Sequence, residues 1–452
     1  MSGADLSMPA VVAPGETVAS MTRRVSDVPL DPRRSWVWWW VTLAISTSML
    51  GLGTIGILWA FYVGIRAWGN SWPVMWGFPI LAYVWWIAIA SGGTFISAFF
   101  FLVRVEWRTS INRMAETMTL FAAACAGIYP ILHLGRPWFA YWLFPYPNVM
   151  TLWPQWKSPL LWDFMALFTY VVCSILFWYF GLMPDLATMR DRARSRFAQI
   201  LYGFFALGFR GSGTQWRHLK ATYAVLAAIM APLVVSVHSV VGLDFAGAAT
   251  PGWHSTEYPP FFVFGALWSG LSTVVLLLLA FRRPLGLAPL ITDRHIRVLA
   301  KLMLTSSLCM TYAYIMDAFE PFYSGEATER IQYLARITGA YAPVYWSMIA
   351  CNCLIPLILC FGWARRSHFA VGLVAVGSIV GMWLERFNIV EITLRRPHLP
   401  SSWGTYVPTL WDWVIFVGTL GLFLTGLLLA IRLVPMISMY EMRELLHGKG
   451  QA

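Results

Sequence analysis

The chain has 452 residues, of which 58% are hydrophobic and only 12% are charged. Soluble domains carry about 25% charged residues, so this composition excludes a protein whose whole surface faces water. The formal net charge of +11 would suit nucleic-acid binding. However, the basic residues lie in short segments between long apolar runs, which indicates orientation in a lipid bilayer and no nucleic-acid partner.

Ten apolar runs are long enough to cross a bilayer as helices, which takes about 20 residues each. They lie near 36–66, 75–103, 114–134, 159–183, 220–243, 258–281, 298–319, 339–361, 369–392 and 410–432. The first run is too long for a signal-peptide core, so we expect no cleavable leader. The sequence therefore predicts an all-α polytopic membrane protein of about ten transmembrane helices.

The lysines and arginines alternate in number from one connection to the next. If residues 1–35 are cytoplasmic, the cytoplasmic segments hold 24 of these residues and the other side holds seven. This asymmetry predicts that the N- and C-termini are both cytoplasmic. The basic, partly amphipathic segment 184–210 is expected to lie along the cytoplasmic headgroups, or alternatively to dock a partner.

The six cysteines all fall inside apolar runs and form no CxxC or CxxCH pattern. We therefore expect no disulfide framework, zinc site or c-type haem. Cys351 and Cys353 are better explained as small residues packing within a helix than as a metal pair. No run offers two histidines at the spacing that holds a buried haem. We therefore expect no metal or haem on this chain, and electrons would leave through a partner.

Ionisable residues from distant parts of the chain fall near the outer ends of the runs. Charged groups within a membrane are costly and tend to be functional. Each one alone has a structural explanation, such as a helix cap, a helix-dipole contact, a bond between helices or a lipid headgroup. Their common level favours one shared site. These residues are His133, Asp163, His238, Asp244, Arg395 and Arg396.

Such a site suits a lipid-soluble quinol, which has an apolar tail and two hydroxyl groups. The tail can enter from the bilayer while the ring reaches polar groups near the surface. A histidine can accept a hydrogen bond from one hydroxyl, and a carboxylate can take its proton. Protons released at this level would leave on the outer side.

A second group of charges lies in the later runs. Asp317 and Glu320 close the run 298–319, and Glu385 and Arg386 lie within the run 369–392. One interpretation is a proton route that couples quinol oxidation to translocation. The other, which the sequence favours, is structural pairing of buried charges.

The motif His133-Leu134-Gly135-Arg136-Pro137-Trp138, followed by Phe144-Pro145-Tyr146-Pro147-Asn148, resembles the NrfD/polysulfide-reductase membrane-subunit family. Later motifs resemble more narrowly the NrfD-like membrane protein of alternative complex III. They are Leu152-Trp153-Pro154, Ser158 to Asp163, Gly181 to Ala187, Ser236 to Ala246 and Met382 to Phe387.

The resemblance implies two four-helix bundles, at 75–243 with the quinol site and at 244–392. They would be flanked by a first helix at 36–74 and by a last helix and cytoplasmic tail at 393–452, after an N-terminal cytoplasmic segment, 1–35, without an assigned role. His133 and Asp163 match the family's catalytic pocket best, followed by Asp244 and then His238 and Arg395 as quinol-binding residues.

The resemblance also implies a setting in a bacterial inner membrane, in a respiratory or photosynthetic chain. The substrate would be menaquinol or ubiquinol. Partners would be an iron–sulfur subunit, multihaem and monohaem cytochrome c subunits, and a second NrfD-like membrane subunit.

Two alternatives stay open. The chain could be the NrfD-type anchor of a molybdopterin oxidoreductase that exchanges electrons with the quinone pool. It could also be a secondary transporter, although transporters hold their substrate near the midplane and the polar residues here lie off-centre.

Overall fold

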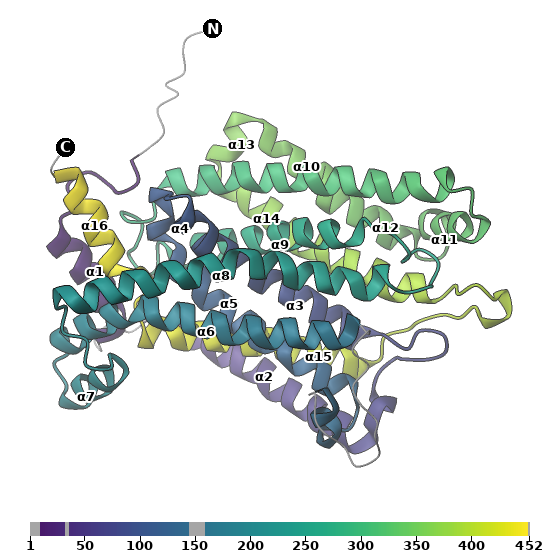
Figure 1. The fold of residues 1–452 in the computed structure, drawn as a ribbon, viewed down its shortest axis with the longest axis horizontal. Coiled ribbons are helices and arrows are strands. Elements are labelled where there is room, and N and C mark those ends of the chain that lie inside the picture. Colours follow the sequence, from purple (N-terminus) through teal and green to yellow (C-terminus); the bar gives the residue numbers. More distant parts are fainter. Residues whose placement is uncertain (1–9, 32–35, 144–158, 451–452) are drawn as a thin grey trace, which may run out of the picture.

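The structure, a computed structural model, describes residues 10–31, 36–143 and 159–450. Within these ranges ten helices are long and apolar enough to cross a membrane, which confirms the predicted class of fold. They run roughly along the long axis of the molecule (Figure 1). The orientation across the bilayer remains a prediction.

The helices that span the membrane are named here with their bounds. They are α2 (Val37–Val63), α3 (Phe78–Thr94), α5 (Asn112–His133), α6 (Pro159–Arg192), α8 (Gly213–Ala246), α9 (Tyr258–Phe281), α10 (Asp293–Tyr323), α12 (Ala342–Ile349), α14 (His368–Phe387) and α15 (Leu410–Leu433).

The remaining helices are short. They are α1 (Val18–Leu30), α4 (Phe100–Leu102), α7 (Arg196–Phe205), α11 (Ala327–Thr338), α13 (Gly362–Arg366) and α16 (Met439–Gly450). π-Helical turns interrupt three of the spans, at Phe95–Phe99, Ala350–Leu354 and Asn388–Ile392.

The segment 184–210 differs from its prediction as one interfacial stretch. Residues 184–192 continue α6, and only Arg196–Phe205 forms a separate helix, α7. α6 has 34 residues and is therefore about 51 Å long, well beyond the roughly 30 Å of a hydrocarbon core. An apolar run marks only the part of a helix inside the hydrocarbon, so it could not reveal this polar extension.

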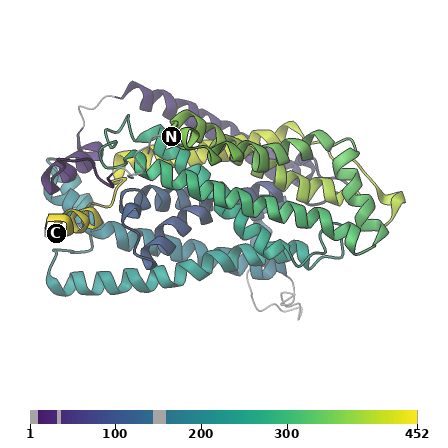
Figure 2. The same ribbon diagram turned by 90° about the horizontal axis from the view of Figure 1, so that it is seen from above.

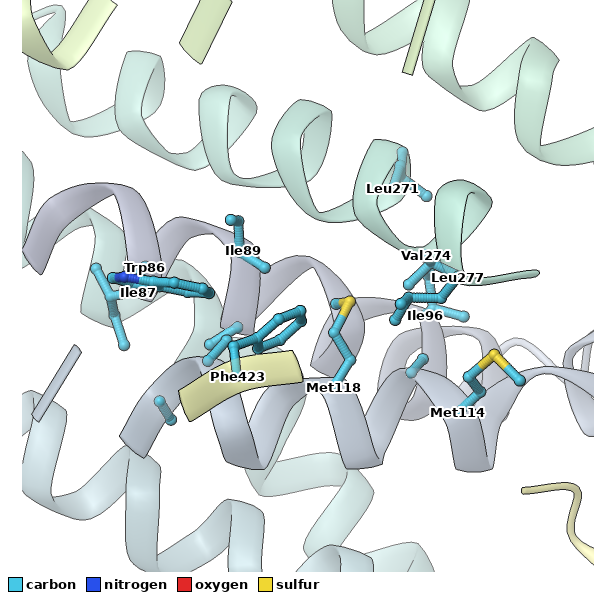
Figure 3. Close-up of a cluster of buried hydrophobic side chains, with 14 of the residues drawn as sticks. Trp86, Ile87, Ile89, Ile96, Met114, Met118, Leu271, Val274, Leu277 and Phe423 are labelled. Carbon is cyan, nitrogen blue, oxygen red and sulfur yellow. The ribbon is translucent and has the colours of Figure 1, made fainter. Parts of the chain in front are cut away.

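α3 and α9 form the centre of the helix packing (Figure 2). α3 contacts α5, α9 and α14, while α9 contacts α8, α10 and α14. Figure 3 shows apolar side chains of α3, α5, α9 and α15 packed together, among them Trp86, Met118, Leu271 and Phe423. α2 and α15 pack against each other, and α15 also contacts α5. The division into two bundles at the predicted bounds stays a prediction.

α1 and α16 lie at the same end of the helices, termed here the terminal end (Figure 1). The N-terminal segment, whose role the sequence did not reveal, connects separate parts of this end. Ala13 N donates to Pro289 O at 2.8 Å, in the connection between α9 and α10, and Arg443 of α16 donates to Thr22 Oγ1 at 3.3 Å. Its buried apolar face consists of Met21, Val25 and Val28.

A buried ionic network joins α5, α6 and α16 at the terminal end. Arg113 lies 3.0 Å from a Glu116 oxygen and 3.3 Å from Asp185. The other Asp185 oxygen accepts hydrogen bonds from the backbone N–H groups of Met439 and Tyr440, at 3.1 and 3.2 Å. It therefore caps the N-terminus of α16. This explains structurally the acidic residue of the motif Gly181 to Ala187.

α3 and α9 approach most closely where Gly92 faces Gly270, since a Cβ on Gly92 would collide with the backbone of Gly270. We expect Gly92→Ala to destabilise the fold by about 1–3 kcal/mol, because the crossing must open to admit the methyl group. Thermal unfolding of the detergent-solubilised protein measures the effect.

Gly51→Ala provides the matched control, because a Cβ there would meet no atom within 4 Å. Its melting temperature should stay at or above that of the wild type. Equal losses in the two variants would contradict a tight crossing of α3 and α9.

Candidate functional site

Three of the helices bring a tyrosine and two carboxyl groups together at the end opposite the termini. Tyr83 lies in the first turns of α3, Asp163 in the first turns of α6 and Asp244 at the end of α8. Tyr83 Oη donates a hydrogen bond of 2.6 Å to Asp163 Oδ2. The two carboxyl groups are close enough for their charges to act on each other and on Tyr83.

The cluster keeps unused hydrogen-bonding capacity. Asp163 is only 7% exposed, yet its Oδ1 has no hydrogen-bond partner among the described residues. Asp244 Oδ1 is likewise buried without a described partner. A buried acceptor without a partner is costly. Two of them side by side form an arrangement that a hydroxyl donor would satisfy.

His133 ends α5 at the same end of the helices. Its Nδ1 is buried and has no described hydrogen-bond partner. The described residues contain no hydrogen bond or ion pair between His133 and Asp163. The motif parts Phe144–Asn148, Leu152–Pro154 and Ser158, which lie between them in the sequence, are outside the described residues. The common level of His133 and Asp163 therefore follows from chain topology, and their meeting in one site stays a prediction.

His238 lies on a different face of α8 from Asp244. The six residues between them correspond to about 600° of helical rotation, or roughly 120° from the same face. His238 is 1% exposed, its Nε2 has no described partner, and it lies within range of the charge of Arg386 on α14. The structure thus groups His238 with Arg386 rather than with the carboxyl pair.

Arg395 has partners of its own outside the carboxyl pair. Its Nε donates to Gly404 O at 3.1 Å, and its guanidinium stacks on Tyr341 at 4.2 Å from the ring centroid. These contacts tie the connection before α15 to the start of α12. Arg396 similarly stacks on Trp403.

A second buried cluster surrounds Glu385 and Arg386 on α14. Arg386 contacts Glu385 at 2.5 Å and stacks on Phe262 of α9 at 4.3 Å. Tyr314 of α10 donates a hydrogen bond to the other Glu385 oxygen. Asn352 Nδ2 donates to Tyr314 Oη at 2.8 Å and extends the chain of polar groups away from Glu385.

Two adjoining cavities lead toward this cluster. The smaller, of about 20 Å³, has room for about one water and is lined by Glu385, Tyr314 and Glu257 among others. The larger, of about 140 Å³, is lined by the acidic residues Glu320, Glu326 and Glu329. Asp317 and Arg336, which are 3.3 Å apart, line both cavities. All four residues predicted for a proton route thus lie around one connected region.

Tyr83, Tyr314 and Asn352 have no signal in the sequence that would mark them as functional. Tyrosine and asparagine inside apolar runs carry no charge, and Asn352 lies between two cysteines that are themselves explained by packing. A π-helical turn at Ala350–Leu354 would have marked it, since such turns are frequent at functional sites, but no sequence pattern reveals one.

The comparison with protein families is decisive for the class of protein. Residues 66–396 match the family described as polysulphide reductase, NrfD. The chain belongs to the NrfD family. The match covers both polar clusters and leaves α1, most of α2, α15 and α16 outside it.

One curated NrfD-like relative is a membrane subunit of a putative dimethyl sulfoxide reductase from Halobacterium salinarum. It is 28% identical over 248 residues, which cover 51% of this chain and 52% of that protein. The match therefore spans about half the length of this relative. Among the described residues of this NrfD protein, no group of three or more His, Cys, Asp or Glu side chains could hold a metal ion.

Glu257, just outside the start of α9, gives the acidic region a measurable pH dependence. Burial, together with the charges of Asp317 and Glu320, raises the pKa of Glu257 to about 8. An unfolded chain has a glutamate pKa of about 4.3, so the folded state binds this proton more tightly. Folded-state stability should therefore fall as the pH rises from about 4.3 to about 8, and then level off.

We expect Glu257→Gln to reduce this loss, because the amide cannot ionise. The measurement is the melting temperature of both proteins at pH values from 5 to about 8. Glu106→Gln, at an exposed carboxyl near the terminal end, serves as the control and should follow the wild type. Parallel curves for wild type and Glu257→Gln would contradict the assignment.

Proposed function

We propose that this chain is the quinone-exchanging membrane subunit of a multisubunit oxidoreductase in a bacterial inner membrane. Its termini would be cytoplasmic, and the opposite end of the helices would face outward. The observation that carries the proposal is Asp163, with one oxygen held by Tyr83 and the other buried without a described partner beside Asp244. Family membership favours this redox role over a transporter.

In the proposed reaction one quinol hydroxyl donates to Asp163 Oδ1, which takes the proton as two electrons leave the ring. Tyr83 holds the carboxyl in place through its hydrogen bond. Asp244 and His133 are the next acceptors along the rim. The second hydroxyl donates to His133 in this scheme, and both protons leave on the outer side. The electrons pass to redox groups on partner subunits.

The relative's printed name favours one class of complex. A dimethyl sulfoxide reductase subunit supports the interpretation of this chain as the anchor of a molybdopterin oxidoreductase, paired with molybdenum and iron–sulfur subunits. Menaquinone and ubiquinone both fit the chemistry. The direction of transfer, quinol oxidation or quinone reduction, would follow the partner's potential.

Alternative complex III is the second candidate. It is favoured by the motif from His133 to Trp138 and by Asp185, whose capping of α16 gives the motif Gly181 to Ala187 a structural role. Its partners would be an iron–sulfur subunit, several c-type cytochromes and a second NrfD-like subunit. Metal analysis of the complex purified through this chain separates the candidates, since molybdenum supports the first and c-type haem the second.

Asp163→Asn should lower quinol turnover by about 10²- to 10⁴-fold, the contribution typical of a general base. Tyr83→Phe should lower it by roughly ten-fold, because it removes one hydrogen bond to a carboxylate, and should shift the pH profile of turnover. Both are measured on the assembled complex with a soluble quinol analogue.

The control is Asp191→Asn, an exposed carboxyl in α6 whose ion pair with Arg190 lies near the terminal end. It should retain full turnover. Retained turnover in Asp163→Asn, in a complex of normal composition, would overturn the proposed site.

We also propose that the Glu385 cluster and its cavities carry protons between the membrane interior and the outer side. The support is the chain from Asn352 through Tyr314 to Glu385, which meets the cavities lined by Asp317 and Arg336. The structural alternative remains strong, because Arg386 alone neutralises Glu385.

Glu385→Gln distinguishes these two roles. It preserves the shape of the side chain but removes the ionisable group, so a proton route predicts fewer protons released per electron in liposomes. An unchanged ratio with normal turnover leaves only the structural role. Glu326→Gln, at the exposed rim of the larger cavity, is the control and should keep the ratio.

A further inference from the structure

An apolar pocket outside both polar clusters lies between α6, α7 and the end of α15. Its volume is about 250 Å³, which exceeds the roughly 150 Å³ of an apolar cavity able to bind benzene. α7 stands beside the main group of helices at the terminal end (Figure 1). The lining residues are Trp178, Tyr179, Leu182, Leu186, Leu201, Tyr202, Phe205, Leu433 and Val434.

The polar atoms of the pocket are already occupied. Tyr179 Oη donates to Phe205 O at 2.6 Å, and Tyr202 Oη donates to Leu433 O at 3.0 Å. These bonds fasten α7 against α6 and α15. What remains for an occupant is a hydrocarbon wall, with Leu201, Phe205 and Leu433 exposed at its mouth.

The outer face of α7 indicates that the mouth opens to lipid. Phe197, Ile200 and Phe204 recur along one side of α7 and are 74%, 60% and 71% exposed. An amphipathic helix with such a stripe binds the boundary between headgroups and acyl chains. The pocket therefore lies just within the hydrocarbon of one leaflet.

Aromatic and basic residues mark the headgroup level beside the mouth. Arg432, next to Leu433, stacks on Trp36 and Trp39 at 4.3 and 5.0 Å from their rings. Tryptophans concentrate at the membrane–water interface. Arg194 and Arg196, at the start of α7, are exposed. Arginine binds phosphate with paired N–H donors, so this border is complementary to an anionic headgroup.

We propose that the pocket holds an acyl chain of an anionic phospholipid of the adjacent leaflet, with its phosphate near Arg194, Arg196 and Arg432. The lipid would fasten α7 to the membrane-spanning helices. A quinone ring would find no free polar atom among the lining tyrosines, and a partner helix of about 10 Å diameter is too wide for the space.

The test uses the purified complex in nanodiscs that contain phosphatidylglycerol with a photoreactive group near the end of one acyl chain. After irradiation, mass spectrometry identifies the labelled peptides. We expect labels on the stretches 178–186 and 201–205. Competition by unlabelled phosphatidylglycerol should exceed competition by phosphatidylcholine, and replacing Arg194 and Arg196 by glutamine should weaken this preference by roughly five-fold per arginine.

Leu201→Trp fills the mouth from a position that is 36% exposed, so the fold should tolerate it while the labelling falls. Leu373→Trp, on the exposed surface of α14, is the matched control and should leave the labelling unchanged. The proposal is overturned if the wild type is unlabelled, if Leu201→Trp labels normally, or if a photoreactive quinone labels the pocket and phosphatidylglycerol does not displace it. Crosslinks to a partner protein in place of lipid would also overturn it.

Discussion

Burying charge among apolar helices is the constraint on which this structure depends. A carboxylate or guanidinium in the membrane needs a partner, because no bulk water is there to solvate it. At the terminal end the need is met by mutual pairing: Arg113 serves Glu116 and Asp185, and Arg108 lies 2.7 Å from Glu441. These pairs close the end of the helices and fasten α16 to them.

The opposite end answers the same constraint incompletely, and that difference separates structure from chemistry. Asp163 is held on one oxygen only, and Asp244 shares its surroundings without a compensating cation among the described residues. A protein that needed Asp163 only for packing would gain by satisfying both oxygens. The Glu385 cluster is intermediate, because its charge is paired but water-sized space lies beside it.

Sequence was sufficient for the class of fold and for the level of the charged residues, because hydrophobic run length and helix direction determine both. It could not reveal lateral grouping. His238 and Asp244 share a helix and a level, yet helical rotation separates their faces, and only packing shows that His238 lies near Arg386. The uncharged members, Tyr83 and Asn352, had no pattern to mark them, and Arg395 matched by level while its bonds belong to Gly404 and Tyr341.

The most direct test of the central claim is a density map of the purified complex with a tightly binding quinol analogue. Our account predicts the polar ring of the analogue within hydrogen-bonding distance of Asp163, beside Tyr83 and Asp244, with its tail leaving toward the lipid. A ring bound beside Glu385, or in the apolar pocket under α7, with Asp163 contacting only protein groups, would contradict it.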